Sequence, residues 1–407
     1  MAYNNSINYA AVFNRILDEK FYIMPRTLWM ENTNPGIEWT GGREIKIPFM
    51  SMDGLGNMQG YKAPDGDLTL GYETKTLQWY RGRNFAIGRY DVDETNMTLT
   101  VGNALRVFLR QHVIPEIDRL RIAKLAQHAV SYGTACVTAQ AASGITANNI
   151  LGLLLDDIAK VQDKIGEDEQ LYIQIGTQMK NLLQQSKEIT RYLNVRDFSI
   201  RSATMRIEAL NEQFLIGTPT SYMNSVVKVN DGRTSGQTVG GVTFEDLGPA
   251  VNWIISARPA ADAVARPQVT KVIDPDTNQE GEFWKIMFSV YHGMWTMDQK
   301  KEGLLVNMDT TLAALTVTSV AGTASGTTVI GVGALDADTA AYYAYKVGDA
   351  AQTVTFGTAL TAAGGWAPLP ADGVITATSG KVATVALVAN GSGLPLASGS
   401  ATVVSAT

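Results

Sequence analysis

Charged residues almost disappear from the sequence after Met308, and this change divides the chain in two. From Thr311 to Thr407, alanine, glycine, threonine, serine and valine dominate. The only charged residues in that stretch are Lys346, Lys381, Asp336, Asp338, Asp349 and Asp372. A composition shift of this kind marks a domain boundary, and the 407 residues of the chain are more than one hydrophobic core usually serves. The sequence therefore predicts a second domain at 311–407, separate from a first unit at 1–310.

Short runs of alternating apolar and polar residues, separated by Gly or Asp, fill the second unit. They lie at 314–320, 327–332, 341–347, 352–356, 374–377, 382–388 and 401–405. Tyr343, Phe356 and Trp366 are among the aromatic residues available for a core. Strands at this spacing predict an immunoglobulin-like β-sandwich. Low-complexity disorder is the alternative, but the alternation and the aromatic residues favour a folded unit.

The first unit begins with extended structure. Residues 1–37 predict an arm with one short amphipathic helix at Tyr9–Asp18. Arg43–Met50 and Thr69–Tyr80 are rich in β-forming residues and flank the Gly-rich stretch Ser51–Gly66. This arrangement predicts a long hairpin with a flexible tip. Because an isolated two-stranded element is marginally stable in water, we expect the hairpin to become fully ordered only against a neighbouring molecule.

A helical pattern follows the hairpin. Apolar residues recur at steps of three and four from about 98 to 130, which predicts one long helix, and Pro115 predicts a kink within it. Two further helices and several strands are expected after it. The helices lie at 148–165 and 177–186, and the strands at 170–175, 205–209 and 251–257. This mixture favours an α+β body over a regularly alternating sheet.

Bulk properties limit the possible partners. The net charge of −6 excludes a general attraction of the whole molecule to polyphosphate, so any contact with nucleic acid must be local. Cys136 is the only cysteine, so no disulfide can form within the chain. No run reaches the roughly 18 apolar residues that a membrane span needs. These features predict a protein that is made and folded in a cytoplasm and has no membrane contact.

Several stretches of the first unit resemble motifs of the major capsid proteins of tailed phages. They are Val113–Arg119, Phe214–Pro219, Ile273–Trp284, Phe288–His292 and Asp298–Val306. The first is similar to the end of the spine helix of that family, and the last three are similar to its closing turn and returning strands. The order of the parts also agrees. The resemblance covers approximately residues 1–310.

The resemblance implies an α+β fold of the Hong Kong 97-like capsid type. Its implied parts are an N-terminal arm at 1–40, an extended loop at 41–88, a peripheral domain at 89–147 and 268–310 with the spine helix at about 98–130, and a mostly axial domain at 148–267. Residues 311–407 have no counterpart in the minimal fold. They would form an immunoglobulin-like decoration domain, which we expect to be dispensable for closing a shell.

As a member of that family, the chain would be a major capsid subunit. Its copies would form the hexamers and pentamers of an icosahedral shell around phage double-stranded DNA, which they would contact without sequence specificity. Portal, scaffolding and decoration proteins are further expected partners. The expected location is the virion capsid, after assembly in the cytoplasm of a bacterial host. We expect contacts between subunits to include charges of the loop and the strand after it: Lys46, Asp53, Lys62, Asp65, Asp67, Glu73, Lys75, Arg81 and Arg83.

Two other shell or surface functions remain open. An encapsulin-type bacterial compartment uses the same fold to hold enzymes instead of DNA. A surface-layer or adhesin protein built on β-modules is a second alternative, although the helical first unit and the missing secretion signal count against it.

No set of residues predicts catalysis, a cofactor or a metal. Gly54–Gly60 misses the dinucleotide-binding spacing. Asp274, Asp276 and Asn278 begin like a calcium loop, but Lys285 stands where the bidentate glutamate belongs. The 3 histidines are scattered along the chain. We therefore expect a structural protein that is not an enzyme, with no catalytic, cofactor-binding or metal-binding residues.

Overall fold

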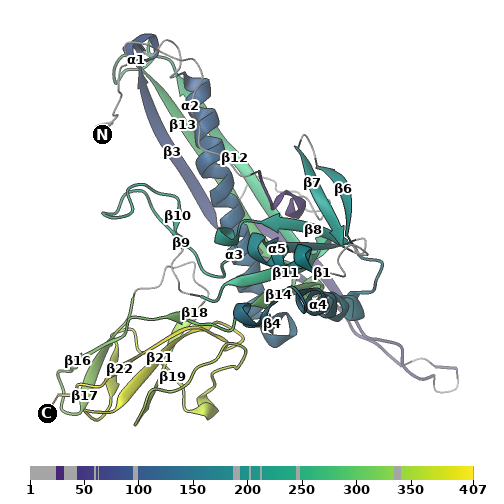
Figure 1. The fold of residues 1–407 in the computed structure, drawn as a ribbon, viewed down its shortest axis with the longest axis vertical. Helices are drawn as coiled ribbons and strands as arrows, with labels where there is room; N and C mark the ends of the chain where they lie inside the picture. Colours follow the sequence, from purple (N-terminus) through teal and green to yellow (C-terminus); the bar gives the residue numbers. More distant parts are fainter. Residues whose placement is uncertain are drawn as a thin grey trace.

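A computed structural model describes most of the chain. The described residues are 24–31, 44–58, 61–62, 64–94, 100–186, 193–200, 203–210, 213–243, 248–333 and 341–406. The helix expected at Tyr9–Asp18 lies outside them. The described residues form mixed helices and sheets of the α+β class (Figure 1), which confirms the predicted fold class at this level.

An antiparallel three-stranded sheet forms the longest part of the molecule. Its strand order is β12 (Ala261–Ile273), β13 (Phe283–Thr296), β3 (Trp79–Gly88), and the short helix α1 (Arg89–Glu94) follows β3. Successive residues of β13 alternate between buried and partly buried over Ile286–His292. This alternation arises because one face of the sheet packs against a helix while the other faces solvent.

The predicted long helix is confirmed, and it packs along this sheet. It consists of α2 (Val101–Phe108), a π-helical turn η2 (Leu109–Val113) and α3 (Ile114–Ser131). Pro115 explains the π turn, because proline has no N–H to donate and its ring collides with the carbonyl one turn earlier. The helix is anchored to the sheet by Phe108, whose ring meets the rings of Phe85 and Phe288 at 4.8 and 5.7 Å.

A seven-stranded mixed sheet forms a second body next to the helix. Its order is β4 (Val137–Ala139), β14 (Leu304–Met308), β11 (Val251–Ala257), β5 (Leu171–Gly176), β8 (Gln213–Thr218), β7 (Ala203–Leu210), β6 (Leu193–Ile200). The β4–β14 and β5–β8 pairs are parallel, and the other pairs are antiparallel. Helices α4 (Ile150–Ile165) and α5 (Thr177–Gln185) pack on its apolar side chains. The helices and strands predicted for this region from the sequence are present within a few residues.

Several short elements connect these bodies. The strands β9 (Lys228–Val229) and β10 (Val242–Thr243) pair as a narrow ribbon beside β3. The short 3-10 helices among the described residues are η1 (Leu28–Met30), η3 (Gly133–Ala135), η4 (Ala142–Gly144), η6 (Thr220–Tyr222), η7 (Arg258–Ala260), η8 (Asp298–Gly303) and η9 (Ala362–Gly364).

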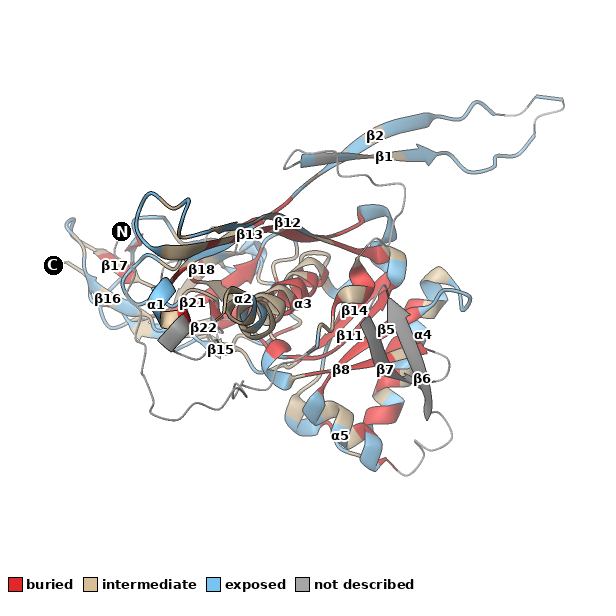
Figure 2. Cartoon of the chain, turned by 90° about the horizontal axis from the view of Figure 1, so that it is seen from above, coloured by how far each residue is buried: buried red, intermediate tan, exposed pale blue. Residues whose placement is uncertain are grey.

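The predicted hairpin is present and projects from the molecule (Figure 2). It consists of β1 (Glu44–Met52) and β2 (Leu68–Thr76), which pair only with each other among the described strands. The strand predicted at Thr69–Tyr80 is not continuous. It breaks at Leu77, which is buried, and the chain then enters β3 in a different sheet. The hairpin is therefore connected directly to the sheet that carries the long helix.

Two β-sheets make up the C-terminal region. One has the order β15 (Ala313–Ala314), β22 (Pro395–Thr402), β21 (Val382–Ala389), β18 (Ala341–Gly348), β19 (Ala367–Pro368). The other has the order β16 (Thr318–Ala321), β17 (Thr327–Gly331), β20 (Val374–Thr376). Ile330, Ile375 and Val385 belong to an apolar cluster between them. The region is thus a folded β-structure with its own buried side chains.

Three strand predictions in this region were wrong. The run at 314–320 is split between β15 and β16. The run at 352–356 pairs with no strand, because Val354 and Phe356 are held by apolar packing instead of ladder hydrogen bonds. The last strand is β22 and not 401–405. It includes Gly399, which resembles a turn signal in the sequence but is required here, because the Leu315 carbonyl oxygen occupies the space of a Cβ atom.

Candidate inter-subunit interface

One face of the hairpin is apolar and lies in solvent. The register pairs Met50 with Leu70 and Met52 with Leu68, and these four side chains are between 54% and 66% exposed. Tyr72 extends the same face and is 62% exposed. Exposed apolar surface on a paired ribbon marks an interaction site, because a solvated strand pair ordinarily carries polar residues. We call Met50, Met52, Leu68, Leu70 and Tyr72 the hairpin face.

The opposite side of the hairpin is fixed to its own subunit. Phe49 covers Gly71, where any Cβ atom would collide with its ring. Ile47 packs against the buried cluster of Leu77, Trp295 and Met297. The base of the hairpin is thus held by its own subunit, while the hairpin face has no partner among the described residues.

Charged contacts also secure the base. The Lys75 ammonium lies 3.2 Å from Glu73 and 3.5 Å from Asp298. The Tyr132 hydroxyl donates to the same Asp298 carboxylate at 2.9 Å and lies 2.7 Å from the Thr296 hydroxyl. Burial raises the pKa of Tyr132, so the phenol stays protonated and keeps this donation. The end of α3 and the start of the hairpin are therefore joined through one carboxylate.

The charges predicted as inter-subunit contacts fall into two groups. Lys46, Lys62 and Asp65 are exposed on the hairpin, and Asp53 accepts a hydrogen bond from the Asp67 amide at 2.8 Å. The other charges have partners within the subunit. Glu73 pairs with Lys75, Arg81 pairs with Glu116 at 2.6 Å, and Arg83 donates to the Thr238 carbonyl at 3.2 Å. A contact between any of these nine charges and a neighbouring subunit stays a prediction.

The hairpin face itself was missed from the sequence. The signal was present, because Pro48, Met50 and Met52 alternate on one strand and Leu68, Leu70 and Tyr72 on the other. Sequence reasoning weighed the charges and did not work out the pairing register that places all of these residues on one side.

The N-terminal segment at 24–31 is fastened to the long helix by buried polar contacts. The Asp118 carboxylate, 2% exposed, accepts from the Thr27 hydroxyl at 2.6 Å and from the Arg26 amide at 2.8 Å. Burial raises the pKa of Asp118, and these hydrogen bonds oppose the shift. Arg121 donates to Glu31 at 2.8 Å, and Trp29 stacks on Tyr172 with 4.7 Å between the rings.

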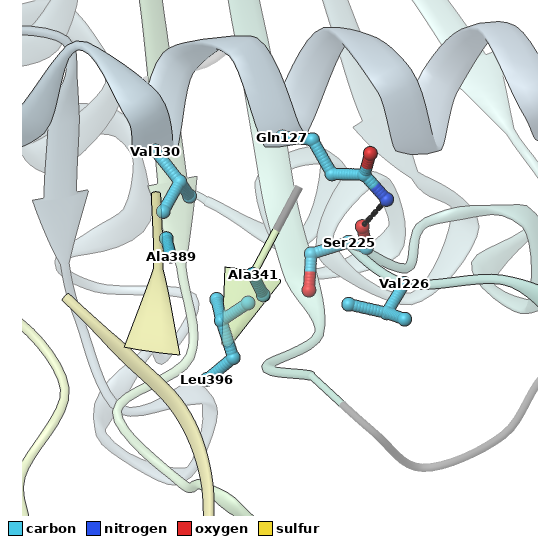
Figure 3. A pocket seen from close by; sticks show the side chains of 7 residues that line it. All are labelled: Gln127, Val130, Ser225, Val226, Ala341, Ala389 and Leu396. Atoms are coloured by element: carbon cyan, nitrogen blue, oxygen red, sulfur yellow. Dashed lines mark hydrogen bonds between the residues drawn. The ribbon is translucent and has the colours of Figure 1, made fainter. Parts of the chain in front are cut away.

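A continuous apolar seam joins the C-terminal sheets to α3. One buried cluster contains Ala126 and Val130 of α3 together with Leu387, Ala389 and Leu396 of the C-terminal region. Figure 3 shows Val130, Ala389 and Leu396 converging beside the hydrogen bond from the Gln127 amide to the Ser225 carbonyl, which is 3.1 Å long. We call this boundary the α3 seam. The apolar packing continues from the first unit into the second, so the two do not have wholly separate cores.

The residues weighed as candidates for catalysis or metal binding make contacts within the fold. The Cys136 thiol is buried, burial raises its pKa, and it donates to the Lys301 carbonyl. Asn278 donates to the Phe283 carbonyl and accepts from the Glu280 amide, which stabilises the turn between β12 and β13. Among the residues the structure describes, no group of His, Cys, Asp and Glu side chains is arranged to hold a metal ion.

Two histidines lie beside cations in the interior, with His292 buried and His128 partly buried. Burial lowers the pKa of His128 to about 4, with Lys124 and Lys75 adding to the effect. Burial and the nearby Arg121 and Arg81 lower the pKa of His292 to about 3. His112 is exposed on the π turn. The His128 and His292 rings are therefore neutral near pH 7.

Within the described part of the chain, no helix has the length and apolar character needed to cross a membrane.

Comparisons with known proteins identify the fold. No family model and no curated protein matches the sequence. Among solved structures, a capsid structure of the cyanophage P-SCSP1u aligns with a TM-score of 0.50 at 11% identity, covering 74% of this chain and 92% of that one. A structure from Mycobacterium phage Che8 aligns with a TM-score of 0.48 at 12% identity, covering 75% of this chain and 98% of that one. The mature capsid of phage PhiM1 aligns with a TM-score of 0.45 at 12% identity, covering 75% of this chain and 93% of that one. The alignment with the cyanophage structure shows a phage-capsid-like α+β fold.

Proposed function

We propose that the chain is the major capsid subunit of a tailed phage and that its copies assemble into an icosahedral shell around double-stranded DNA. The observation that carries this proposal is the fold shared with the cyanophage capsid structure over most of both chains. The hairpin face supports it, because a monomer gains nothing from a projecting apolar ribbon, whereas a subunit that tiles a closed surface needs one.

The hairpin would lie on a neighbouring copy in the shell. Its base is held by Lys75 and Ile47, so its direction is fixed before assembly. Burial of the hairpin face would stabilise each contact by roughly 25 cal/mol per Å² of apolar surface removed from water. Repetition over many identical contacts then gives a stable shell from individually weak ones.

We further propose the Hong Kong 97-like arrangement for the parts of the chain. The proposed parts are the arm at 1–40, the extended loop at 41–88, the peripheral domain at 89–147 and 268–310, and the mostly axial domain at 148–267. The long helix beside a narrow sheet and the compact seven-stranded body support the last two assignments.

Residues 311–407 would be an immunoglobulin-like decoration domain. Two sheets packed around Ile330, Ile375 and Val385 support a sandwich. The first strand, β15, pairs in parallel with the last, β22, while the longer strands pair antiparallel.

The proposed partners follow from the shell. They are other copies of the chain in hexamers and pentamers, non-specifically bound DNA, and portal, scaffolding and decoration proteins. The location would be the virion, after assembly in the host cytoplasm.

Electron microscopy of the expressed chain tests the function. We expect closed particles of uniform size, and particles made during infection should contain DNA. Only monomers or irregular aggregates, under a range of salt and protein concentrations, would contradict the proposal. Particles filled with protein cargo in place of DNA would indicate an encapsulin-type compartment.

A further inference from the structure

Among the methionines whose exposure the structure describes, the most exposed lie on the hairpin. Met50 and Met52 of β1 are 57% and 66% exposed, and Met58, between β1 and β2, is 59% exposed. Leu70 and Leu68 lie opposite the first two across the ribbon. The hairpin projects from the rest of the molecule (Figure 2), so its thioethers are open to reagents in the solvent. We call Met50, Met52 and Met58 the hairpin methionines.

The other described methionines are shielded to a greater degree. The buried ones expose at most 6% of their surface, and they are Met30, Met223, Met294, Met297 and Met308. Met179 and Met287 are partly buried. Met24 is 41% exposed, but it lies in the segment at 24–31 and not on the hairpin. The fold therefore separates the hairpin methionines from the others by their access to solvent.

Peroxide converts an exposed thioether to a sulfoxide in one step. The sulfur attacks one oxygen of hydrogen peroxide, the O–O bond breaks, a sulfur–oxygen bond forms and the other oxygen leaves as water. The sulfur loses two electrons and the peroxide gains them. The sulfoxide is polar, whereas the thioether is apolar and flexible. Oxidation of the hairpin methionines would thus place polar groups on an apolar face.

The only cysteine of the chain is shielded from the same oxidant. The thiolate is the form of cysteine that reacts. Cys136 is 2% exposed, and burial raises its pKa, so it is a protonated thiol at neutral pH. Its sulfur also donates to the Lys301 carbonyl. Peroxide therefore meets the hairpin methionines before it meets a reactive thiol.

Oxidation at these positions is compatible with a folded subunit. Each hairpin methionine is more than half exposed, so its packing contributes little to the free energy of unfolding. A contact between copies is different, because the sulfoxide oxygen would leave water beside Leu68 and Leu70, whose side chains have no hydrogen to donate to it. Burial of a polar group without a hydrogen bond costs free energy. The modification therefore opposes burial of the hairpin face and does not oppose the fold.

We propose that the hairpin methionines are an oxidation site at which peroxide converts the subunit from a form that assembles into one that does not. The loss of assembly rests on the proposed capsid function, whereas the oxidation does not. A methionine sulfoxide reductase would reverse the change, because two thiols form a disulfide while the sulfoxide oxygen leaves as water. Leucine would supply similar apolar volume without this chemistry, which makes it the substitution for a test.

Peptide mapping by mass spectrometry tests the site without any need for assembly. The full-length, unassembled chain is treated with hydrogen peroxide and samples are quenched at intervals. We expect the hairpin methionines to be oxidised at least about tenfold faster than Met30 and Met294, which react only through opening of the fold. The thermal midpoint should not change at that stage. Equal rates at exposed and buried positions, or unfolding together with hairpin oxidation, would overturn the inference.

Leucine variants test the effect on assembly. One variant carries Met50→Leu, Met52→Leu and Met58→Leu, and the control carries Met24→Leu. After peroxide treatment, we expect the unmodified chain and the control to need at least about tenfold more protein to form particles. The hairpin variant should assemble equally well with and without peroxide. Loss of its particles on oxidation would place the sensitive site elsewhere and overturn the inference.

Enzymatic reduction gives a second measurement that does not depend on the hairpin variant. The oxidised, unmodified chain is treated with methionine sulfoxide reductases and a thiol reductant. Particles should return as the sulfoxides disappear from the peptides that contain the hairpin methionines. Reduction of these sulfoxides without the return of particles would overturn the inference, even where the hairpin variant itself does not assemble.

The two proposals can fail separately. If the untreated, unmodified chain forms particles and oxidation of the hairpin methionines leaves their formation unchanged, the inference is wrong and the capsid function stands. If the untreated chain forms no particles under any condition, the proposed function fails and the loss of assembly fails with it. The mapped oxidation rates still decide whether the hairpin is the oxidation site.

Discussion

The hairpin and the C-terminal sheets both extend from the central body, yet they differ in whether their apolar side chains are exposed or buried. The hairpin leaves Met50 and Leu70 in solvent, whereas the C-terminal region buries Leu387 and Leu396 against α3. A projecting region that buries its apolar face against its own subunit contributes to the folding stability of that subunit. One that leaves it exposed is stabilised only by a partner. Under the proposed capsid function, the hairpin would serve assembly and the C-terminal region would serve the stability of the subunit.

The largest expected effect comes from removing residues 311–407. The sequence alone suggested that this segment is dispensable, but its removal would expose Ala126, Val130 and the rest of the α3 seam. We expect residues 1–310 to aggregate when expressed alone, and partition between soluble and insoluble fractions measures this. Recovery of a folded, particle-forming fragment would break the comparison and restore the picture of a dispensable domain.

Polar substitutions on the hairpin face should have a comparable effect on assembly and almost none on the fold. We expect Met50→Asp with Leu70→Asp to abolish particles, because two charges would be buried at each contact. The thermal midpoint of the free subunit should stay within a few degrees. Ser51→Asp with Thr69→Asp, a pair on the opposite side of the same ribbon, serves as the control. Normal particles from the first variant would remove the hairpin face from the interface.

A matched leucine pair measures the contrast within one kind of substitution. Leu396 is 4% exposed in the α3 seam, and Leu70 is 54% exposed on the hairpin. We expect Leu396→Ala to lower the free energy of unfolding by about 2–5 kcal/mol, and Leu70→Ala to lower it by less than about 0.5 kcal/mol. Urea unfolding of the unassembled subunit gives both numbers. Similar costs would mean that the hairpin is already packed in the free subunit.

Acid should weaken the body that both regions depend on. The pKa of His128 in the folded state is about 4, below the ordinary value of 6.5, so the fold favours the neutral ring. The stability from this preference is fully present above about pH 6.5 and is lost as the pH falls toward 4, by on the order of 3 kcal/mol. His128→Gln should reduce the acid dependence of unfolding over that range. An unchanged pH profile would show that the ring is accessible to water.

Sequence patterns with strong local causes were predictable. The long helix followed from the spacing of its apolar residues. The break at Leu77 and the strand through Gly399 were not predictable, because each depends on a distant segment that approaches the backbone. The α3 seam was hidden for the same reason. Val130 and Leu396 look like ordinary core residues until the tertiary arrangement brings them together.

The fastening of residues 24–31 has a consequence for the order in which the chain folds. This segment touches α3 through Asp118, β5 through Tyr172 and β12 through the bridge between Glu31 and Ala263. It is synthesised before the elements that it contacts, and its docking site is complete only after Ala263 of β12 has been synthesised. We expect contacts so distant in sequence to form late in folding. We therefore expect docking of residues 24–31 to be a late step that requires a correctly folded body.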